Sequence, residues 1–225
     1  MIGMTNMTID FQIYHGDWLE VLPTRAPKIV SFVFADPPYN VGKDYGVYKD
    51  KLSPEEYLHR MGLLLSISRM LATRGVGMYV SGALLPTYLQ LMPTAHPVIV
   101  YKRAAGVAKQ GWRQQYHVAL IEGRPIVITR DLIDDIRLPG EGYYFKEKRY
   151  KNPGLTSLEL TKRIINMMTK EGETVLDPFM GSGTTGEACI QLNRNFIGIE
   201  IDPDQCGIAY KRIQNAKNQL VLANS

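Results

Sequence analysis

The sequence predicts an α/β protein with a mostly parallel sheet that carries helices on both faces. Short apolar runs, typical of buried strands, alternate along the chain with longer segments of helical periodicity. The run at residues 29–35 is apolar almost throughout, as strands of a parallel sheet are because both of their faces are covered. At residues 174–192 a strand leads through a glycine-rich turn into a helix, a connection found in parallel α/β sheets.

The other elements have their own local signals. A helix is expected over residues 53–71, because the Ser53 hydroxyl can cap its N-terminus and Glu56 completes a capping box. Its apolar stripe, expected to face the core, consists of Tyr57, Met61, Leu64, Leu65 and residues 67–70. Arg74-Gly75 is expected to end this helix before a strand over residues 76–80. Further expected elements are short helices near residues 84–91 and 184–192, a helix from about residue 156, and strands over residues 97–101, 117–121, 174–176 and 195–199.

The strand predicted at residues 29–35 runs directly into Asp-Pro-Pro-Tyr-Asn at residues 36–40. Two consecutive prolines cannot continue a hydrogen-bonded ladder, so the strand must stop there. The result is a rigid turn with a carboxylate, fixed carbonyl groups and an aromatic ring at the carboxyl end of a strand, which is where open α/β sheets bind ligands. Taken alone, so short a motif is equally consistent with an ordinary strand-ending turn.

A second motif occupies residues 174–186, which read Thr-Val-Leu-Asp-Pro-Phe-Met-Gly-Ser-Gly-Thr-Thr-Gly. Its glycines, Gly181 and Gly183, let the backbone approach a ligand closely. The next predicted strand ends at Glu200, and an acidic residue in that place can accept both hydroxyls of a ribose. A phosphate-binding P-loop is excluded because no Lys-Ser/Thr follows the last glycine. A dinucleotide site is formally allowed, because the three glycines of Gly181-x-Gly183-x-x-Gly186 fit its fingerprint.

The full strings carry a closer resemblance. Asp-Pro-Phe-Met-Gly-Ser-Gly-Thr-Thr resembles the S-adenosylmethionine site of methyltransferases, and Asp-Pro-Pro-Tyr resembles the catalytic motif of amino-methyltransferases, which methylate the exocyclic amine of adenine or cytosine in nucleic acid. The catalytic motif comes first and the cofactor motif last, an order that resembles the circularly permuted beta group of DNA amino-methyltransferases. The resemblance covers about residues 12–100 and 152–213. It implies a Rossmann-like S-adenosylmethionine-dependent methyltransferase fold.

The resemblance also implies catalytic roles for the residues of the first motif. An exocyclic amine is a poor nucleophile, because its lone pair is delocalised into the ring, and hydrogen-bond acceptors on its N–H groups free that lone pair. In the family these acceptors are the aspartate carboxylate and the carbonyl of the first proline, here Asp36 and Pro37. Pro37 and Pro38 hold the turn rigid, which is the preorganisation that catalysis needs. Tyr39 would stack on the target base, which must leave the duplex to be reached.

A cofactor site built from both ends of the chain follows from the same resemblance. The family's N-terminal signature is seen here at residues 14–20, where Asp17 would contact the adenine ring of the cofactor, and Asp17 is equally suited to cap a following helix. A lysine that relatives usually carry is absent from residues 152–157; instead Thr156 with Glu159 can begin a helix whose N–H groups bind the methionine carboxylate. The predicted cofactor-binding residues are Asp17, Thr156, Asp177, Phe179, Gly181, Ser182, Gly183, Thr184, Thr185 and Glu200.

The positive charge is concentrated in one segment. Residues 101–151 hold 11 Lys/Arg and 6 Asp/Glu, a balance of +5, so the remainder of a chain of net charge +4 carries −1. Basic groups interleaved with aromatic residues are suited to binding a phosphate backbone and an unstacked base. Clusters of basic residues more often belong simply to a solvated loop, which is the alternative here. In the family this variable segment reads the DNA sequence, and here it predicts a small recognition insert at about residues 102–152. The predicted DNA-binding residues are Lys102, Arg103, Lys109, Arg113, Lys148 and Arg149.

Length and composition set the remaining expectations. A chain of 225 residues with 45% hydrophobic residues suits one methyltransferase domain over residues 1–225. No apolar stretch reaches the about 18 residues of a membrane span, and no secretory signal pattern is present, so a cytoplasmic protein of a bacterium, or of a phage in its host, is expected. Cys189 and Cys206 are expected to be buried and reduced, and the scattered histidines predict no metal site.

The function expected from the sequence is methyl transfer from S-adenosylmethionine to the 6-amino group of adenine in DNA, with the base flipped out. Adenine is favoured because family members with an initial aspartate in the catalytic motif mostly modify adenine. Methylation of the cytosine amine, methylation of adenine in RNA, and an inactive relative that only binds cofactor or DNA remain as alternatives. The glycine-rich residues 40–50 are expected to form a lid over the substrate. So small an insert also makes a homodimer one way to hold the duplex. A restriction system, protection of a phage genome and regulation are all consistent settings.

Overall fold

The computed structural model describes residues 9–25, 29–42, 44–45, 47–101, 116–127, 132–133 and 158–224. Within these ranges the strands of the main sheet are β1 (Phe11–His15), β2 (Val30–Ala35), β5 (Ala72–Val80), β6 (His96–Tyr101), β7 (Tyr116–Gly123), β8 (Leu132–Ile133), β9 (Thr174–Asp177) and β10 (Asn195–Glu200). A separate hairpin pairs β3 (Asp44–Tyr45) with β4 (Tyr48–Lys49). The helices are α1 (Trp18–Arg25), α2 (Pro54–Leu71), α3 (Leu85–Leu91), α4 (Leu158–Met168), α5 (Thr184–Gln191) and α6 (Pro203–Asn224).

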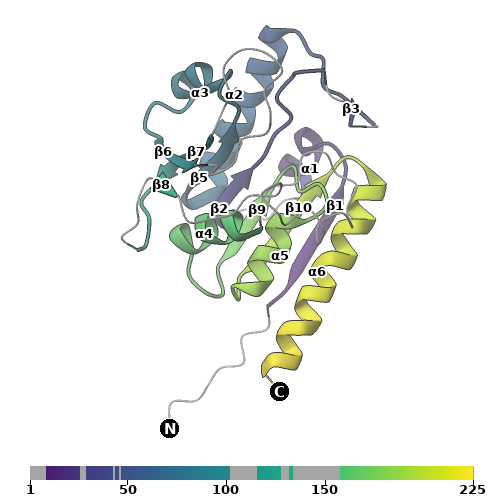
Figure 1. The fold of residues 1–225 in the computed structure, drawn as a ribbon. Helices are drawn as coiled ribbons and strands as arrows, with labels where there is room; N and C mark the ends of the chain where they lie inside the picture. Colours follow the sequence, from purple (N-terminus) through teal and green to yellow (C-terminus); the bar gives the residue numbers. More distant parts are fainter. Residues whose placement is uncertain are drawn as a thin grey trace.

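The main sheet has the strand order β1-β10-β9-β2-β5-β7-β6-β8 (Figure 1). Every neighbouring pair is parallel except the two pairs made by β7, which runs antiparallel to both β5 and β6. The predicted α/β class with a mostly parallel sheet is therefore confirmed. β7 and β8 fall inside the segment predicted as a DNA-recognition insert, yet both belong to this sheet.

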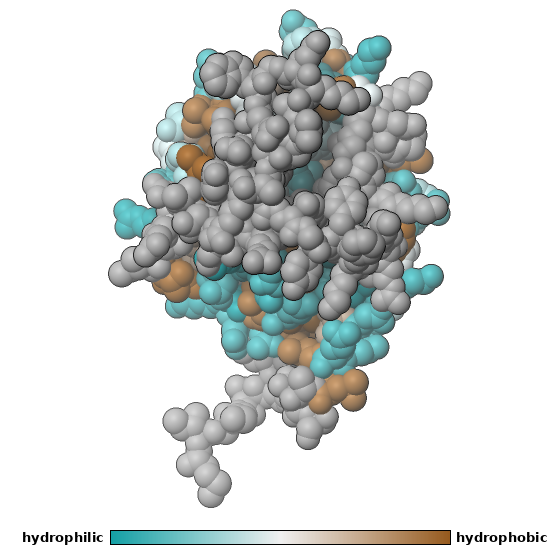
Figure 2. Space-filling model, in the orientation of Figure 1, coloured by the Kyte–Doolittle hydropathy of each residue, from teal (hydrophilic) through white to brown (hydrophobic). Residues whose placement is uncertain are grey.

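Helices cover both faces of the sheet, as predicted, and each face has its own apolar core (Figure 1). Along β2 the side chains alternate, so that Phe32 and Phe34 pack toward α4, α5 and α6, while Val33 and Ala35 pack toward α1, α2 and α3. Both faces of this strand are thus buried, which explains its continuous apolar sequence. Where α4, α5 and α6 lie, hydrophilic residues make up most of the visible coloured surface, and hydrophobic ones form small patches (Figure 2).

The strand order brings together two segments that lie far apart in the chain. β2 pairs with β9 in the register Phe32↔Val175 and Val33↔Leu176. Because parallel strands end at the same edge of a sheet, the turn after β2 and the turn after β9 meet there. At the same edge β1 pairs with β10, with His15 opposite Glu200.

The transition from α2 to β5 corrects one prediction. Ser53 caps α2 as expected, its Oγ accepting from the N–H of Glu56 at 3.2 Å. The helix then ends at Leu71 and β5 begins at once, so the expectation that Arg74-Gly75 forms the helix stop is wrong. Gly75 instead allows β5 to lie close to its antiparallel neighbour β7: it has a φ of +149°, and a Cβ on it would lie 1.9 Å from the carbonyl oxygen of Glu122 in β7.

Two further expectations concern the cysteines and membrane spans. Cys189 on α5 is buried as predicted, whereas Cys206 on α6 is only half-buried, and both are free thiols. None of the helices in the described ranges has the length and hydropathy needed to cross a membrane. Across those same ranges, no group of three or more His, Cys, Asp or Glu side chains is arranged to hold a metal ion.

Candidate active site

The turn after β2 places a carboxylate and a phenol against each other. Asp36 follows the last residue of the strand, and the hydroxyl of Tyr39 donates to its Oδ1 at 2.6 Å. Burial raises the pKa of Tyr39 above its ordinary range, and the negative charge of Asp36 raises it further. Tyr39 is therefore a neutral hydrogen-bond donor to the carboxylate at neutral pH. The two side chains predicted to act on a target base are close neighbours in the folded chain.

The glycine-rich segment predicted as a lid contains the β3–β4 hairpin, and its base is firmly held. Asp50, whose side chain is buried, accepts from the backbone N–H groups of Asn40 at 2.7 Å and Val41 at 3.0 Å. The Asn40 side chain accepts from the N–H of Leu52 at 2.7 Å and donates to the carbonyl of the same residue at 3.0 Å. These bonds join the end of the Asp-Pro-Pro-Tyr turn to the start of α2. The predicted closing motion of the segment stays a prediction.

The turn after β9 is folded around Asp177. This residue is 3% exposed, and its carboxylate accepts from the Thr185 hydroxyl at 2.6 Å and from the backbone N–H of Phe179 at 2.9 Å. Burial raises the pKa of Asp177 to about 7, and the negative charges of Asp36 and Glu200 contribute to the rise. The three carboxylates therefore share one edge of the sheet.

Gly183 shows why this turn needs glycine. Its φ is +85°, in the left-handed region, and a Cβ on it would lie 2.9 Å from the Cβ of Ala209 on α6. Any other residue would be strained in conformation and would also push α6 away. The glycine thus lets the turn and α6 pack closely, and its predicted role in the approach of a ligand stays a prediction.

Glu200, at the end of β10, is hydrogen-bonded to the same turn. One carboxylate oxygen accepts from the N–H of Gly181 at 2.8 Å, and the other accepts from the N–H of Asp202 at 2.9 Å. A carboxylate has about four acceptor positions, so each oxygen can still accept a ligand hydroxyl. Burial raises the pKa of Glu200 above its usual range, and the backbone donors oppose that rise.

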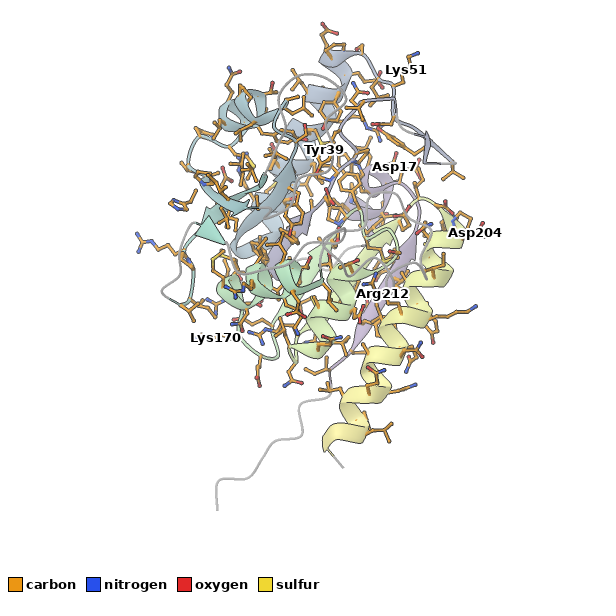
Figure 3. All side chains as sticks on the ribbon, viewed as in Figure 1. Asp17, Tyr39, Lys51, Lys170, Asp204 and Arg212 are labelled. Carbon is orange, nitrogen blue, oxygen red and sulfur yellow. The ribbon has the colours of Figure 1, made fainter. Side chains whose placement is uncertain are left out.

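Asp17 lies beside Glu200, because the N–H of Gly16 donates to the backbone carbonyl of Glu200 at 2.9 Å. Its Oδ1 accepts from the N–H of Leu19 at 3.0 Å, so Asp17 caps α1 as the sequence suggested. Its Oδ2 makes an ion pair of 2.8 Å with Arg60 on α2. Figure 3 shows Asp17 close to Tyr39 in this view, on the side of the sheet where the two turns meet.

Arg212 on α6 supports the turn after β9, which is the predicted cofactor turn, and the sequence analysis missed it. Its side chain is 5% exposed, forms an ion pair with Glu187, and donates to Thr184 Oγ1 at 2.9 Å and to Ser182 Oγ at 3.4 Å (Figure 3). Arg60 was missed for the same reason: both arginines sit on helices with no motif around them. The signal that could have found them is a charged residue at a helix position that faces the core, because such a residue needs a buried partner.

The remaining predicted site residues fall outside the described residues. These are Thr156 of the cofactor set and all six predicted DNA-binding residues, Lys102, Arg103, Lys109, Arg113, Lys148 and Arg149. α4 begins at Leu158, close to the predicted helix start. Among the described residues, the sheet brings Asp17, Asp36, Asp177 and Glu200 to one edge.

Comparison with known proteins identifies the kind of protein that has this arrangement. A family model described as DNA methylase matches residues 109–211. The chain is 28% identical to the DNA adenine methyltransferase YhdJ of Escherichia coli, covering 92% of this chain and 83% of that protein. It is 26% identical to the type II methyltransferase M.HpaI of Haemophilus parainfluenzae, covering 93% and 76%.

Solved structures show the same fold. The complex of M1.HpyAVI with S-adenosylmethionine has a TM-score of 0.70 at 23% identity, covering 90% of this chain and 98% of that one. The cytosine-N4-specific PvuII DNA methyltransferase has a TM-score of 0.71 at 16% identity, covering 95% and 93%. The turns after β2 and β9, the two relatives and the family model all indicate a DNA methyltransferase. The chain is similar to the DNA amino-methyltransferases over most of its length, and it is an S-adenosylmethionine-dependent DNA methyltransferase.

Proposed function

We propose that this enzyme methylates the 6-amino group of adenine in DNA. The observation that carries the proposal is the pairing of β2 with β9, which sets Asp36 and its prolines beside the Asp177 turn. An amine held at the first turn would then face a methyl donor held at the second. Since the sulfonium of S-adenosylmethionine is already a strong electrophile, the protein mainly has to position the two groups and exclude water.

Each residue of the first turn has a distinct part in this chemistry. The Asp36 carboxylate and the Pro37 carbonyl accept the two N–H groups of the target amine, and this frees the nitrogen lone pair. That lone pair forms the new N–C bond while the C–S bond breaks, and the amine gives up one proton to solvent. The prolines fix the acceptors in advance, which is where most of the rate enhancement of such a site arises.

The second turn and its neighbours suit the cofactor. Glu200 is oriented by two backbone donors and retains acceptor positions for the ribose hydroxyls. Gly181 and Gly183 let the backbone come close, Phe179 packs edge-on to Trp18 with ring centroids 6.2 Å apart, and Asp17 is next to that pair. The wider set of Asp177, Ser182, Thr184 and Thr185 shapes the turn.

The target base must leave the duplex, and Tyr39 would receive it. Its hydroxyl donates to Asp36, so an incoming amine competes with that hydroxyl for the carboxylate or uses its other oxygen. Stacking on a tyrosine ring compensates part of the unstacking energy that flipping requires. The basic residues between 102 and 152 would hold the DNA backbone, and a second subunit would extend the grip of so small an insert.

Adenine is the proposed base for two reasons. The catalytic motif begins with aspartate, as in family members that mostly modify adenine, and a relative covered over most of its length is named a DNA adenine methyltransferase. The cytosine 4-amino group offers the same geometry, and the PvuII enzyme shares the fold. A direct product analysis separates the two.

Incubation with methyl-deuterated S-adenosylmethionine and unmethylated genomic DNA, followed by digestion to nucleosides and mass spectrometry, tests the proposal. Labelled methyladenine is the expected product. Label confined to methylcytosine would replace the base assignment while keeping the chemistry. Label in neither base, from a protein that binds the cofactor in calorimetry, would favour RNA or a non-catalytic role. The same digest of structured RNA distinguishes those two.

A further inference from the structure

Two buried tyrosines outside the motif are connected to the catalytic turn by hydrogen bonds. Tyr57 on α2 donates its hydroxyl to the backbone carbonyl of Pro38 at 3.1 Å. The hydroxyl of Tyr88 on α3 lies 2.7 Å from the hydroxyl of Tyr57. Tyr57 is 3% exposed and Tyr88 is fully buried. A chain of contacts thus runs from α3 through α2 to the peptide that follows the catalytic prolines.

Chemistry fixes the direction of these bonds. A carbonyl oxygen only accepts, so the single proton of the Tyr57 hydroxyl is used in the bond to Pro38. Tyr88 must therefore be the donor to Tyr57. Burial raises the pKa of Tyr88 above its usual range, and the neighbouring Tyr57 and Asp36 raise it further, so Tyr88 keeps its proton. The chain of donors is Tyr88 to Tyr57 to the Pro38 carbonyl.

The bond to Pro38 restrains the carbonyl before it. The Pro37 and Pro38 carbonyls belong to successive peptide planes, which are related only by φ and ψ of Pro38. The pyrrolidine ring already fixes that φ near about −65°. The remaining freedom is ψ of Pro38, and a hydrogen bond that holds the Pro38 carbonyl removes it. Tyr57 therefore sets the orientation of the Pro37 carbonyl indirectly, through its bond to the Pro38 carbonyl.

Within the part of the chain that the structure describes, Tyr57 makes the one hydrogen bond to the backbone of the two prolines. Prolines have no N–H, so residues 37 and 38 offer no donor to a neighbouring strand. Among the described residues, the next backbone restraints come two and three residues later, where Asp50 accepts from the N–H groups of Asn40 and Val41. Tyr57 holds the part of the turn between the last strand residue and this anchor.

We propose that Tyr57 is a positioning residue of the methyl-transfer site, that it fixes the catalytic turn through the Pro38 carbonyl, and that Tyr88 acts only through Tyr57. The inference rests on the proposed function, since it assigns the Pro37 carbonyl to the reacting amine. It predicts that the hydroxyls matter for the rate of methyl transfer beyond their effect on folding.

Single and double phenylalanine variants separate positioning from stability. Tyr57→Phe removes the bond to Pro38 and also leaves the buried Tyr88 hydroxyl without the acceptor that Tyr57 supplies. We expect the single-turnover rate of methyl transfer to fall about five- to tenfold and the melting temperature to fall by roughly 2–6 °C. The dissociation constant of S-adenosylmethionine should stay within about twofold of wild type, because the cofactor turn is untouched.

The double variant Tyr57→Phe/Tyr88→Phe gives the decisive comparison. Removing both hydroxyls also removes the unpaired Tyr88 donor, so most of the lost melting temperature should return. The methyl-transfer rate should stay as low as in Tyr57→Phe, because the bond to Pro38 is still missing. Tyr88→Phe alone should transfer within about twofold of wild type. Tyr210→Phe, on the exposed side of α6, is the matched control for deleting a tyrosine hydroxyl.

A rate that recovers together with the melting temperature in the double variant would overturn the inference, and so would a wild-type rate in Tyr57→Phe. Hydrogen exchange provides a readout that needs no activity. The amides of Asn40 and Val41 should exchange faster in Tyr57→Phe and in the double variant than in Tyr210→Phe, and equal exchange would also overturn the inference. A wild-type protein that transfers no methyl group to DNA would count against the proposed function, while the exchange experiment still decides the role of Tyr57.

Discussion

Replacing Arg212 with methionine should loosen the cofactor turn and destabilise the fold together. The guanidinium is almost fully buried and makes three contacts with the segment that begins α5: an ion pair with Glu187 and hydrogen bonds to Thr184 and Ser182. Methionine matches the length of the arginine stem and keeps its packing, so the substitution removes mainly the charge and the donors. The perturbation therefore isolates the polar support of the turn.

The magnitude follows from the burial of the two partners. Removing one member of a fully buried ion pair costs about 3–5 kcal/mol, because the other charge is left uncompensated. Glu187 remains 21% exposed, so water can partly solvate it, and we expect a loss of about 2–3 kcal/mol. At roughly 2–4 °C for each kcal/mol in a chain of this size, the melting temperature should fall by about 5–10 °C. Cofactor affinity should fall about tenfold, because Ser182 and Thr184 lose the donor that orients them.

Urea denaturation and calorimetric titration with S-adenosylmethionine measure the two effects. Lys217→Met is the matched control, because Lys217 is on the same helix and pairs with Asp10 on the surface, where the side chains are 28% and 71% exposed. Such a pair contributes only about 0–0.5 kcal/mol. If Arg212→Met and Lys217→Met were equally stable and bound the cofactor equally well, the supporting role of Arg212 would be refuted.

Three further predictions concern the carboxylates of the site. Asp36→Ala should abolish methyl transfer and leave the calorimetric dissociation constant of the cofactor largely unchanged; near-normal turnover would remove Asp36 from the mechanism. Glu200→Ala should weaken cofactor binding at least about tenfold, since an ionised acceptor of two hydroxyls is lost, and an unchanged dissociation constant would refute its ribose role. Burial raises the pKa of Asp177 to about 7 from 3.8, so the folded state keeps a proton that the unfolded chain has released; this contribution to stability is present below pH 3.8 and is lost as the pH rises toward 7. Between about pH 5 and pH 8 the wild type should lose at least about 1 kcal/mol more unfolding free energy than Asp177→Asn, and equal losses in urea denaturation would contradict the assignment.

Much of the fold was predictable because its signals are local. The apolar run of β2 ends where two prolines stop it, and α2 begins where Ser53 can cap it. The motif at residues 174–186 predicted a strand, a turn and the start of a helix, and the structure has β9 and α5 at these places. Each of these boundaries depends on a few neighbouring residues, and the sequence contains all of them.

The expected helix stop at Gly75 failed for the opposite reason. A glycine after a helix commonly marks its end, but here it is needed because β7 passes at that point and leaves no room for a side chain. The approaching residue, Glu122, is almost fifty positions later in the chain. No local pattern distinguishes a glycine that ends a helix from one that lets two paired strands approach closely.

The residues that support the site could not be predicted for the same reason, because their partners are distant in the sequence. Tyr57 was correctly predicted to lie on the apolar stripe of α2. Its hydroxyl, however, donates to a backbone carbonyl 19 positions earlier in the chain, and its other partner, Tyr88, lies on a different helix. Arg60 and Arg212 find their partners across 43 and 28 positions. A motif identifies the residues that touch the ligand, whereas the residues behind them are chosen by packing between distant elements.

The structure also explains why the order of the two motifs in the chain places no constraint on the reaction. The catalytic turn is held by bonds from α2 and from the base of the hairpin, through Tyr57, Asp50 and Asn40. The cofactor turn is held by bonds within its own half, through Asp177, Thr185 and Arg212. The short β2–β9 ladder joins the strands that lead into the two turns, and it fixes the distance between the turns whichever of them comes first in the chain. Substitutions behind the catalytic turn should therefore change the rate of transfer, and those behind the cofactor turn should change the affinity for the cofactor, with little effect of either on the other.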